Sequence, residues 1–452
     1  MNSKERKSLS LFAITWPIMI EVFLYMLMGS VDTMMLSKVS DDAVAAVGVT
    51  NQIISIAIVM FGFITSGAGI IIAQYLGANQ KEKAIEMGSI SIGVNFIFGV
   101  IISVVMIAFS NSFLNLMNVP INLQDFSKTY LLIVGGFLFI QSSMMSAGTV
   151  LRVHQFTKDA MFITLGMNIL NVIGNYLFIF GVFGVPKLGV TGVAISTIVS
   201  KTIGFFIVLF LLRKRLNQSF KVKDFFEFKK EYVLNILKIG VPSAGEHLAY
   251  NSSQLMITYM ITFIGANALA TKVYAQNISM FIFLFAVSIG QGTQILVGHL
   301  VGANKMDEAY HRCIKSLKIS ILVSLTIAAI FAGLSKPLFS IFTDNAEVIQ
   351  LGSILLLLNI LLEPGRTFNL VVINSLRAAG DVTFPVVMGI ISMWGVSVTL
   401  SYILGIKFGL GLIGIWIAFS VDEWFRGIIM LFRWKSRIWE RKRLITKVPE
   451  DE

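Results

Sequence analysis

Hydrophobic residues in this chain form long, nearly unbroken runs that short polar or basic segments separate. A helix needs about 20 mostly apolar residues to cross the hydrocarbon core of a bilayer, which is about 30 Å thick. Twelve runs meet this requirement, at residues 11–36, 44–76, 88–110, 126–150, 159–183, 188–212, 233–264, 268–300, 313–335, 348–376, 381–406 and 410–432. The pattern therefore predicts an all-α integral membrane protein with twelve transmembrane helices.

Composition narrows the class of protein further. Of the 452 residues, 56% are hydrophobic and 13% are charged, whereas soluble domains carry about 25% charged residues. This difference excludes a soluble enzyme. One cysteine and four histidines provide neither an internal disulfide nor a cluster of metal ligands, and no H-E-x-x-H motif supports an intramembrane enzyme. We predict no catalytic residues, no metal and no cofactor.

The positions of the charged residues predict the orientation of the chain. The net charge is +11, and most Lys and Arg lie at the N-terminus, in the loops after even-numbered runs and at the C-terminus. The opposite loops carry only Lys38, Lys128, Lys187, Lys336 and Lys407. The positive-inside rule then places both termini in the cytoplasm of a multi-pass protein of the cell membrane. Topology and contact with anionic lipids explain the basic excess, so we expect no nucleic-acid partner.

The sequence repeats itself at an offset of 225 residues. GANQKEKA at 77–84 recurs as GANKMDEA at 302–309. The same offset aligns several further pairs, namely Pro17 with Pro242, Glu21 with Glu246, Tyr25 with Tyr250, and Leu151-Arg152 with Leu376-Arg377. A single offset held over so many elements indicates an internal duplication rather than chance similarity between apolar helices.

The repeat predicts the division into domains. We expect an N-terminal six-helix lobe at 1–215, a basic cytoplasmic linker at 216–232, a C-terminal six-helix lobe at 233–432 and a basic tail at 433–452. Six is an even number, so the lobes have the same orientation and are related by a pseudo-twofold axis along the membrane normal. Repeats of this kind in transporters place the substrate between the lobes and permit alternating access.

Polar side chains within the first half need an explanation, because a charge at the bilayer centre costs at least about 2.5–3.5 kcal/mol. Glu21 and Asp32 lie on one face of the first helix, about 16 Å apart along its axis. Asp32 lies either at the outer interface or on an acidic stripe that faces an aqueous cavity. Asn168, Asn171 and Asn175 share a face of the fifth helix, and they form either an interhelical hydrogen-bond ladder or part of an ion site.

The second half has its own polar positions. Glu246, His247 and Tyr250 lie on the seventh helix, and Glu363 and Arg366 are three residues apart on the tenth. A spacing of three permits an ion pair within the helix, which is either a structural pair or a gate whose arginine acts on Glu246 or Glu363. His247 points away from Glu246 and is interpreted as a packing residue.

Two lysines within the apolar runs, Lys201 and Lys272, are interpreted as side chains that reach a membrane interface.

Several segments, together with the repeat, resemble the MATE family of multidrug and toxic compound extrusion transporters. They are WPIMIEVFLYMLMGSVDTMMLS at 16–37, AQYLGANQ at 73–80, NVIGNYLFIFG at 171–181, GVTGVAIST at 189–197 and LRAAGDVTFP at 376–385. The resemblance covers essentially the whole chain. It implies a twelve-helix exporter that expels lipophilic or cationic organic compounds, by alternating access, in exchange for H⁺ or Na⁺.

The resemblance also implies roles for individual residues. Asp32 occupies the position of the first-helix aspartate of the family's N-lobe ion site, Asn171 and Asn175 fall on its helix 5 pair, and Thr197 falls on its helix 6 position. The second helix 5 position is often Asp in the family and is Asn here, which leaves one carboxylate. We therefore expect ion coupling at these four residues.

The C-terminal lobe departs from the family's cation site. The helix 7 glutamate of that site falls on Tyr250, and the helix 10 aspartate falls on Arg366, whose charge would repel Na⁺. Glu21, Glu246, Tyr250, Glu363 and Arg366 are therefore predicted only as polar residues of the substrate cavity or the C-lobe.

The rival interpretation is a flippase for lipid-linked saccharides. Such a protein needs cations to hold a pyrophosphate, for which Arg366 and Lys272 are the candidates. The carboxylates outnumber them, which favours cationic or neutral cargo. We expect the exporter to be a monomer. The sequence distinguishes neither H⁺ from Na⁺ nor one substrate from another.

Overall fold

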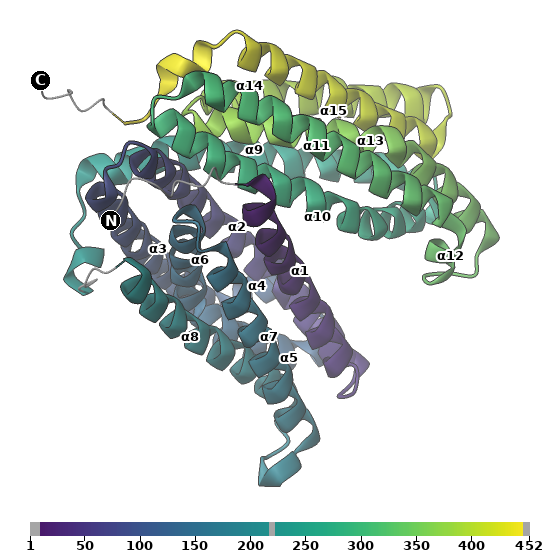
Figure 1. The fold of residues 1–452 in the computed structure, drawn as a ribbon. Coiled ribbons are helices and arrows are strands. Elements are labelled where there is room, and N and C mark those ends of the chain that lie inside the picture. Colours follow the sequence, from purple (N-terminus) through teal and green to yellow (C-terminus); the bar gives the residue numbers. More distant parts are fainter. Residues whose placement is uncertain (1–9, 217–221, 446–452) are drawn as a thin grey trace, which may run out of the picture. The chain divides into compact units, whose positions relative to one another are not determined.

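The computed structural model describes residues 10–216 and 222–445. Every regular element within these ranges is helical, and the long helices run side by side in bundles (Figure 1). They are α1 (Leu11–Leu36), α2 (Asp41–Gly77), α3 (Lys81–Ala108), α4 (Ser110–Leu116), α5 (Ile121–Tyr130), α6 (Leu138–Val153), α7 (Thr157–Phe180), α8 (Gly189–Leu216), α9 (Lys230–Thr262), α10 (Ala266–Gly302), α11 (Met306–Gly333), α12 (Ser335–Ser340), α13 (Ala346–Ala378), α14 (Thr383–Ser392) and α15 (Gly411–Lys435).

The structure also contains short 3₁₀-helical and π-helical segments. Three turns are 3₁₀-helical, at Val182–Gly184, Val222–Phe225 and Ile438–Lys442. Three segments are π-helical, at Leu131–Gly135, Met393–Val398 and Ser401–Lys407. The last two continue α14, so this helix reaches Lys407 as one span.

The helices confirm the predicted spans. Within the described residues, nine helices are long and apolar enough to cross a membrane, and the bent pair Ile121–Gly135 and Leu138–Val153 makes a tenth. α9 and α15, with 33 and 25 residues, occupy the seventh and twelfth predicted spans. α15 is less apolar because it carries ionisable residues such as Glu423 and Arg426, and α9 because it carries residues such as Lys238 and Glu246.

The fourth span is bent, which the hydrophobic pattern did not predict. Its two parts meet at an angle of 45°. Gly135 and Gly136 lie at the break, and a Cβ atom at Gly135 would approach the Cβ of Met106 to 3.2 Å. Glycine pairs and π-helical turns are recurrent causes of helix bends, and both are present here.

The chain forms two compact units. The N-terminal unit consists of Ile20–Ile72 and Gln80–Gly240, and the C-terminal unit consists of the described residues of Met1–Met19, Ala73–Asn79 and Val241–Glu452. Parts of the predicted linker and tail, residues 217–221 and 446–452, lie outside the described residues.

Each unit has its own apolar core. In the N-terminal unit, Phe61, Leu131 and Val193 are among the fully buried residues of one cluster. In the C-terminal unit, α13 packs against α10, α11 and α15, and its Leu355 lies in a buried cluster with Phe339. The buried faces of the spans make these cores, while many Phe, Leu and Ile side chains elsewhere are exposed, as expected of surfaces that face lipid.

The repeated GAN motif forms the same turn in both places. Asn79 and Asn304 both have a φ of 60°, a left-handed conformation that asparagine tolerates better than most residues. The glycine of each motif lies against a backbone carbonyl within the C-terminal unit. A Cβ atom would come within 2.0 Å of the His299 oxygen at Gly77 and within 2.0 Å of the Gln74 oxygen at Gly302. Close packing therefore requires both glycines.

Candidate functional site

Asp32 of α1 lies inside the N-terminal unit and contacts α7. Its side chain is buried, with 7% exposed. The Asn175 side-chain nitrogen donates a hydrogen bond of 2.6 Å to its Oδ1. Burial of Asp32 does not distinguish the outer interface from a stripe that faces an aqueous cavity, so both sequence-based interpretations of its position stay predictions.

A short series of amide and hydroxyl groups continues from Asp32. Asn175 also donates to the Asn171 side-chain oxygen at 3.3 Å, and Asn171 donates to the Thr197 hydroxyl at 3.2 Å. All three side chains are buried. The structure thus brings together the four residues that were predicted for ion coupling.

The sequence of α7 and α8 explains this local arrangement. Asn171 and Asn175 are four residues apart and share one helical face. Gly174 allows α8 to approach that face, since a Cβ atom there would lie 2.3 Å from the Ser196 hydroxyl oxygen. The Ser196 hydroxyl in turn donates to the Asn171 carbonyl at 2.9 Å, which fixes the register of the two helices.

Two residues near Asp32 were not predicted. The Tyr130 hydroxyl, at the end of α5, reaches the side chains of Asn51 and Thr197, and Tyr130 lies close enough to Asp32 to interact with its charge. Lys201 interacts electrostatically with Asp32 from α8. Its interpretation as an interfacial side chain is wrong, because Lys201 lies in the middle of α8. Thr197 and Lys201 are four residues apart, and this spacing was the signal in the sequence.

Glu21 and Glu246 each pair with an arginine at the end of a helix later in the same unit. In the N-terminal unit, Arg152 of α6 donates to Glu21 at 2.6 Å. In the C-terminal unit, Arg377 of α13 donates to Glu246. Both contacts follow the 225-residue repeat, which aligns Glu21 with Glu246 and Arg152 with Arg377. Of the two carboxylates on which Arg366 was predicted to act, Glu246 therefore has Arg377 as its partner, and Glu363 contacts Arg366 itself.

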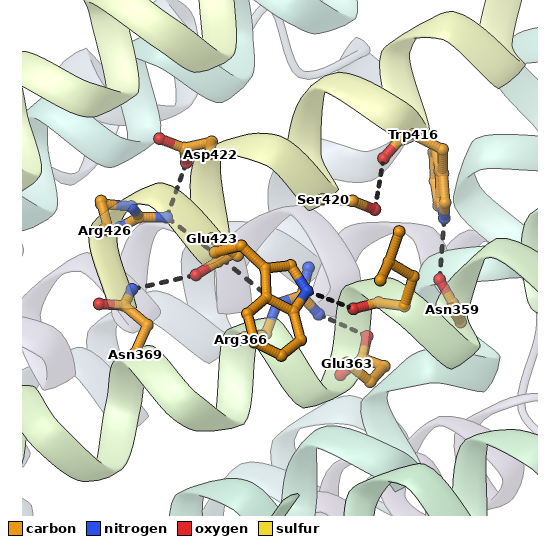
Figure 2. Close-up of polar contacts among 11 residues, drawn as sticks. Asn359, Glu363, Arg366, Asn369, Trp416, Ser420, Asp422, Glu423 and Arg426 are labelled. Carbon is orange, nitrogen blue, oxygen red and sulfur yellow. Dashed lines mark hydrogen bonds and ion pairs between the residues drawn. The ribbon is translucent and has the colours of Figure 1, made fainter. Parts of the chain in front are cut away.

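The C-terminal unit contains a larger charged cluster that joins α13 to α15 (Figure 2). Arg366 donates to Glu363 at 2.8 Å, and its Nε lies 3.6 Å from Glu423. Glu423 also lies 3.1 Å from Arg426 and accepts a hydrogen bond of 3.0 Å from Asn369. The predicted Glu363–Arg366 pair is present and belongs to this cluster.

The cluster extends toward α14. Arg426 donates to Asp422 at 2.8 Å, and Ser392 donates to the other Asp422 oxygen at 2.5 Å. A cavity of about 30 Å³ adjoins these residues and is also lined by Tyr250, the remaining predicted C-lobe residue. Three carboxylates and two guanidinium groups therefore largely neutralise one another.

Lys272 does not reach an interface either. It is 5% exposed, and it donates a hydrogen bond to the Thr258 hydroxyl. Its interpretation as an interfacial side chain is therefore also wrong. Within the described ranges, no group of three or more His, Cys, Asp or Glu side chains is arranged to hold a metal ion.

Comparison with protein families gives a match to both halves of the chain. The MatE family model matches residues 17–177 and again residues 242–403. These two ranges begin 225 residues apart, which is the offset of the internal repeat.

Curated relatives match over nearly the full length. An uncharacterized transporter of Bacillus subtilis, YisQ, is 49% identical over 96% of this chain and 96% of its own. A probable multidrug resistance protein NorM of Thermotoga maritima is 28% identical, over 97% of this chain and 94% of its own.

Solved structures share the fold at lower identity. The bent form of the Vibrio cholerae MATE transporter VcmN superposes with a TM-score of 0.87 at 20% identity, covering 95% of this chain and 96% of its own. A transporter of the MOP superfamily from Pyrococcus furiosus, described as having a binding pocket of reversed polarity, superposes with a TM-score of 0.85 at 20% identity, covering 95% of each chain.

Proposed function

Because this chain belongs to the MatE family of membrane transporters, we propose that it exports lipophilic or cationic organic compounds in exchange for H⁺ or Na⁺. The repeat and the loop charges support two six-helix lobes, at 1–215 and 233–432, with both termini in the cytoplasm of the cell membrane. Alternating access would expose the substrate site first to the cytoplasm and then to the outside.

The observation that carries the proposal is the chemistry around Asp32. Among the described residues, the side chain of Asp32 accepts its hydrogen bond from an amide, that of Asn175, and not from a guanidinium group. An amide orients a carboxylate without cancelling its charge, so Asp32 remains able to attract a cation. A proton, Na⁺ or a cationic substrate can each supply the positive charge that Asp32 attracts.

In the proposed cycle these cations compete for Asp32. With the site open to the cytoplasm, ionised Asp32 attracts a cationic substrate. With the site open to the outside, H⁺ or Na⁺ neutralises Asp32, the hydrogen bonds of Asn171 and Asn175 rearrange, and the substrate is released. One charge that crosses 100 mV contributes about 2.3 kcal/mol, which corresponds to roughly fiftyfold accumulation.

Four arginines that contact carboxylates argue against an anionic cargo. A flippase for lipid-linked saccharides would use them to hold a pyrophosphate, but Arg152, Arg366, Arg377 and Arg426 each contact a carboxylate. Cations that are already neutralised attract a phosphate weakly.

The test uses purified protein in liposomes loaded with ethidium, with a pH gradient and a Na⁺ gradient imposed separately. We expect one gradient to drive ethidium movement in the wild type and in Asp41→Asn, which removes an exposed carboxylate of α2. Asp32→Asn should abolish this movement. Full gradient-driven transport by Asp32→Asn would refute the role of Asp32, and no transport under either gradient would favour the flippase.

A further inference from the structure

A groove in the C-terminal unit is lined neither by the residues around Asp32 nor by the charged cluster of α13 and α15. It has a volume of about 590 Å³ and is bounded by the first part of α1, by α10 and by α11. All of its residues belong to the C-terminal unit. Its walls are mainly apolar, with Trp16 and Met19 on α1 and Phe285 and Ile289 on α10. A groove of this size and polarity accommodates part of an amphipathic molecule.

The wall formed by α11 changes character along its length. Arg312, Lys315, Ile319 and Val323 line the groove, and their spacings of three and four residues place them on one helical face. The two cations come first and the two aliphatic residues follow. From Arg312 to Val323 this stripe extends about 16 Å, which is close to one leaflet of a hydrocarbon core of about 30 Å.

The direction of the side chains places the cations at the membrane surface. Side chains of a helix lean toward its N-terminus, and α11 begins at the cytoplasmic end in the orientation proposed above. Arg312 and Lys315 start about 9 and 14 Å from the beginning of α11, so their long side chains extend back toward the lipid headgroups.

Arg312 and Lys315 differ from Arg152, Arg366, Arg377 and Arg426 because neither of them contacts a carboxylate in the described part of the chain. No hydrogen bond or ion pair connects Arg312 or Lys315 to another residue in the described part of the chain, and neither Asp nor Glu lines the groove. Arg312 is half-buried and Lys315 is exposed. An anion in the groove would therefore meet two positive charges that carboxylates have not neutralised.

The internal repeat shows that the fold itself does not require these cations. α3 is the counterpart of α11 at the offset of 225, and it carries Met87 and Ile90 at the equivalent positions. Both are fully buried. The cations are thus specific to the second half of the chain.

The α1 wall offers a hydrogen-bonding group as well. The Thr15 hydroxyl is buried and has no hydrogen-bond partner among the described residues. It lines the groove and lies against α10, where a Cβ atom at Gly292 would come within 2.5 Å of it. Trp16 beside it is a residue type that concentrates where headgroups meet acyl chains.

We propose that this groove binds one anionic phospholipid of the cytoplasmic leaflet. Its phosphate lies between Arg312 and Lys315, and one acyl chain follows Ile319 and Val323 toward the middle of the membrane. The assignment to the cytoplasmic leaflet rests on the proposed orientation, whereas recognition of an anionic headgroup does not.

The test measures lipid binding to purified full-length protein by native mass spectrometry. Two probes with the same acyl chains are titrated, palmitoyl-oleoyl phosphatidylglycerol, which is anionic, and palmitoyl-oleoyl phosphatidylcholine, which has no net charge. Lys315→Gln is compared with Lys318→Gln, because both lysines are exposed residues of α11 and only Lys315 lines the groove. We expect Lys315→Gln to weaken phosphatidylglycerol binding about fivefold and Lys318→Gln to leave it unchanged.

A second variant exchanges the cations for the residues of the first repeat. Arg312→Met/Lys315→Ile should weaken phosphatidylglycerol binding about 25-fold and leave phosphatidylcholine binding unaltered. Equal binding of the two lipids by the wild type would overturn the proposal, and so would equal losses in Lys315→Gln and Lys318→Gln. Because this experiment includes no gradient and no transported compound, its outcome is independent of whether the export proposal succeeds.

Discussion

Each unit contains one of the repeated Glu–Arg pairs, but the two units treat their other buried carboxylates in different ways. Asp32 of the N-terminal unit receives a hydrogen bond from the Asn175 amide, whereas Glu363, Asp422 and Glu423 of the C-terminal unit contact Arg366 or Arg426. A guanidinium group supplies a permanent counter-charge, and an amide supplies only orientation. The same residue type is thus available to a mobile cation in one unit and already neutralised in the other.

This difference predicts that mutations in the two units have different consequences, on the stability of the fold in one and on the binding of a cation in the other. A buried ion pair stabilises the fold only while both partners remain, because removal of one leaves an uncompensated charge. A carboxylate that an amide holds, and that Lys201 influences only electrostatically, as at Asp32, still gains from a cation that binds to it directly. We therefore expect mutations in the charged cluster to affect stability and mutations around Asp32 to affect transport.

The largest expected effect comes from removing the central arginine of the cluster. Arg366→Gln leaves Glu363 and Glu423 without their shared counter-charge, which should lower the free energy of unfolding by about 3–5 kcal/mol. Thermal unfolding in detergent measures this loss, with Asp32→Asn as the comparison. Asp32→Asn should unfold at or above the wild-type temperature, and a larger loss there than in Arg366→Gln would contradict the distinction between the units.

The next effect isolates one of the repeated ion pairs. Glu21→Gln leaves Arg152 without its carboxylate and should destabilise the protein by roughly 3 kcal/mol. The double variant Glu21→Gln/Arg152→Gln removes both charges and should recover at least half of that loss. A double-mutant cycle measures the coupling between the two residues, and strict additivity would show that the pair contributes nothing.

A smaller effect should follow from removal of the Asn175 amide beside Asp32. Asn175→Ala removes a hydrogen bond to a charged group, worth about 1.5–3 kcal/mol. We expect the gradient-driven transport to persist, with at least a tenfold change in the ion concentration that gives half-maximal rate. Asn168→Ala is the control, since Asn168 lies on the same helix and donates to the Leu24 carbonyl instead. An equal change in both variants would assign Asn175 a general packing role.

The smallest effect concerns Lys201. Its positive charge lies close enough to interact with Asp32 and opposes the entry of a second cation. Lys201→Gln should therefore increase the apparent affinity for the coupling ion, by about threefold to fivefold for an interaction of about 1 kcal/mol. The same transport assay measures it, and a decrease in affinity would mean that Lys201 helps to form the ion site.

The sequence predicted the elements better than it predicted their partners. Hydrophobic runs predicted the ends of the spanning helices to within seven residues, and the run 11–36 coincides with α1, because a helix that crosses the bilayer needs a continuous apolar segment. The spacings of Asn171 and Asn175 on α7, and of Glu363 and Arg366 on α13, correctly indicated shared faces because such spacing is local.

Contacts between distant helices were harder to predict. Tyr130 reaches Thr197 from the end of a bent span, and neither the bend nor the rotation of the helix is encoded in apolar length. The repeat aligned Arg377 with Arg152, yet apolar length alone did not predict that Arg377 of α13 contacts Glu246 of α9. A carboxylate and an arginine that both recur at the repeat offset are candidates for an ion pair in each half. Glu21 with Arg152, and Glu246 with Arg377, are such pairs.

The Glu–Arg pairs have a consequence for how this chain was assembled. Each joins residues 131 positions apart, and each closes within its own repeat. A polypeptide one repeat long would already hold both members, so duplication and fusion of such an ancestor would have created no unmatched buried charge. The junction at residues 216–232 is accordingly a natural place to divide the gene, because the two polypeptides expressed from its parts would each keep a complete pair.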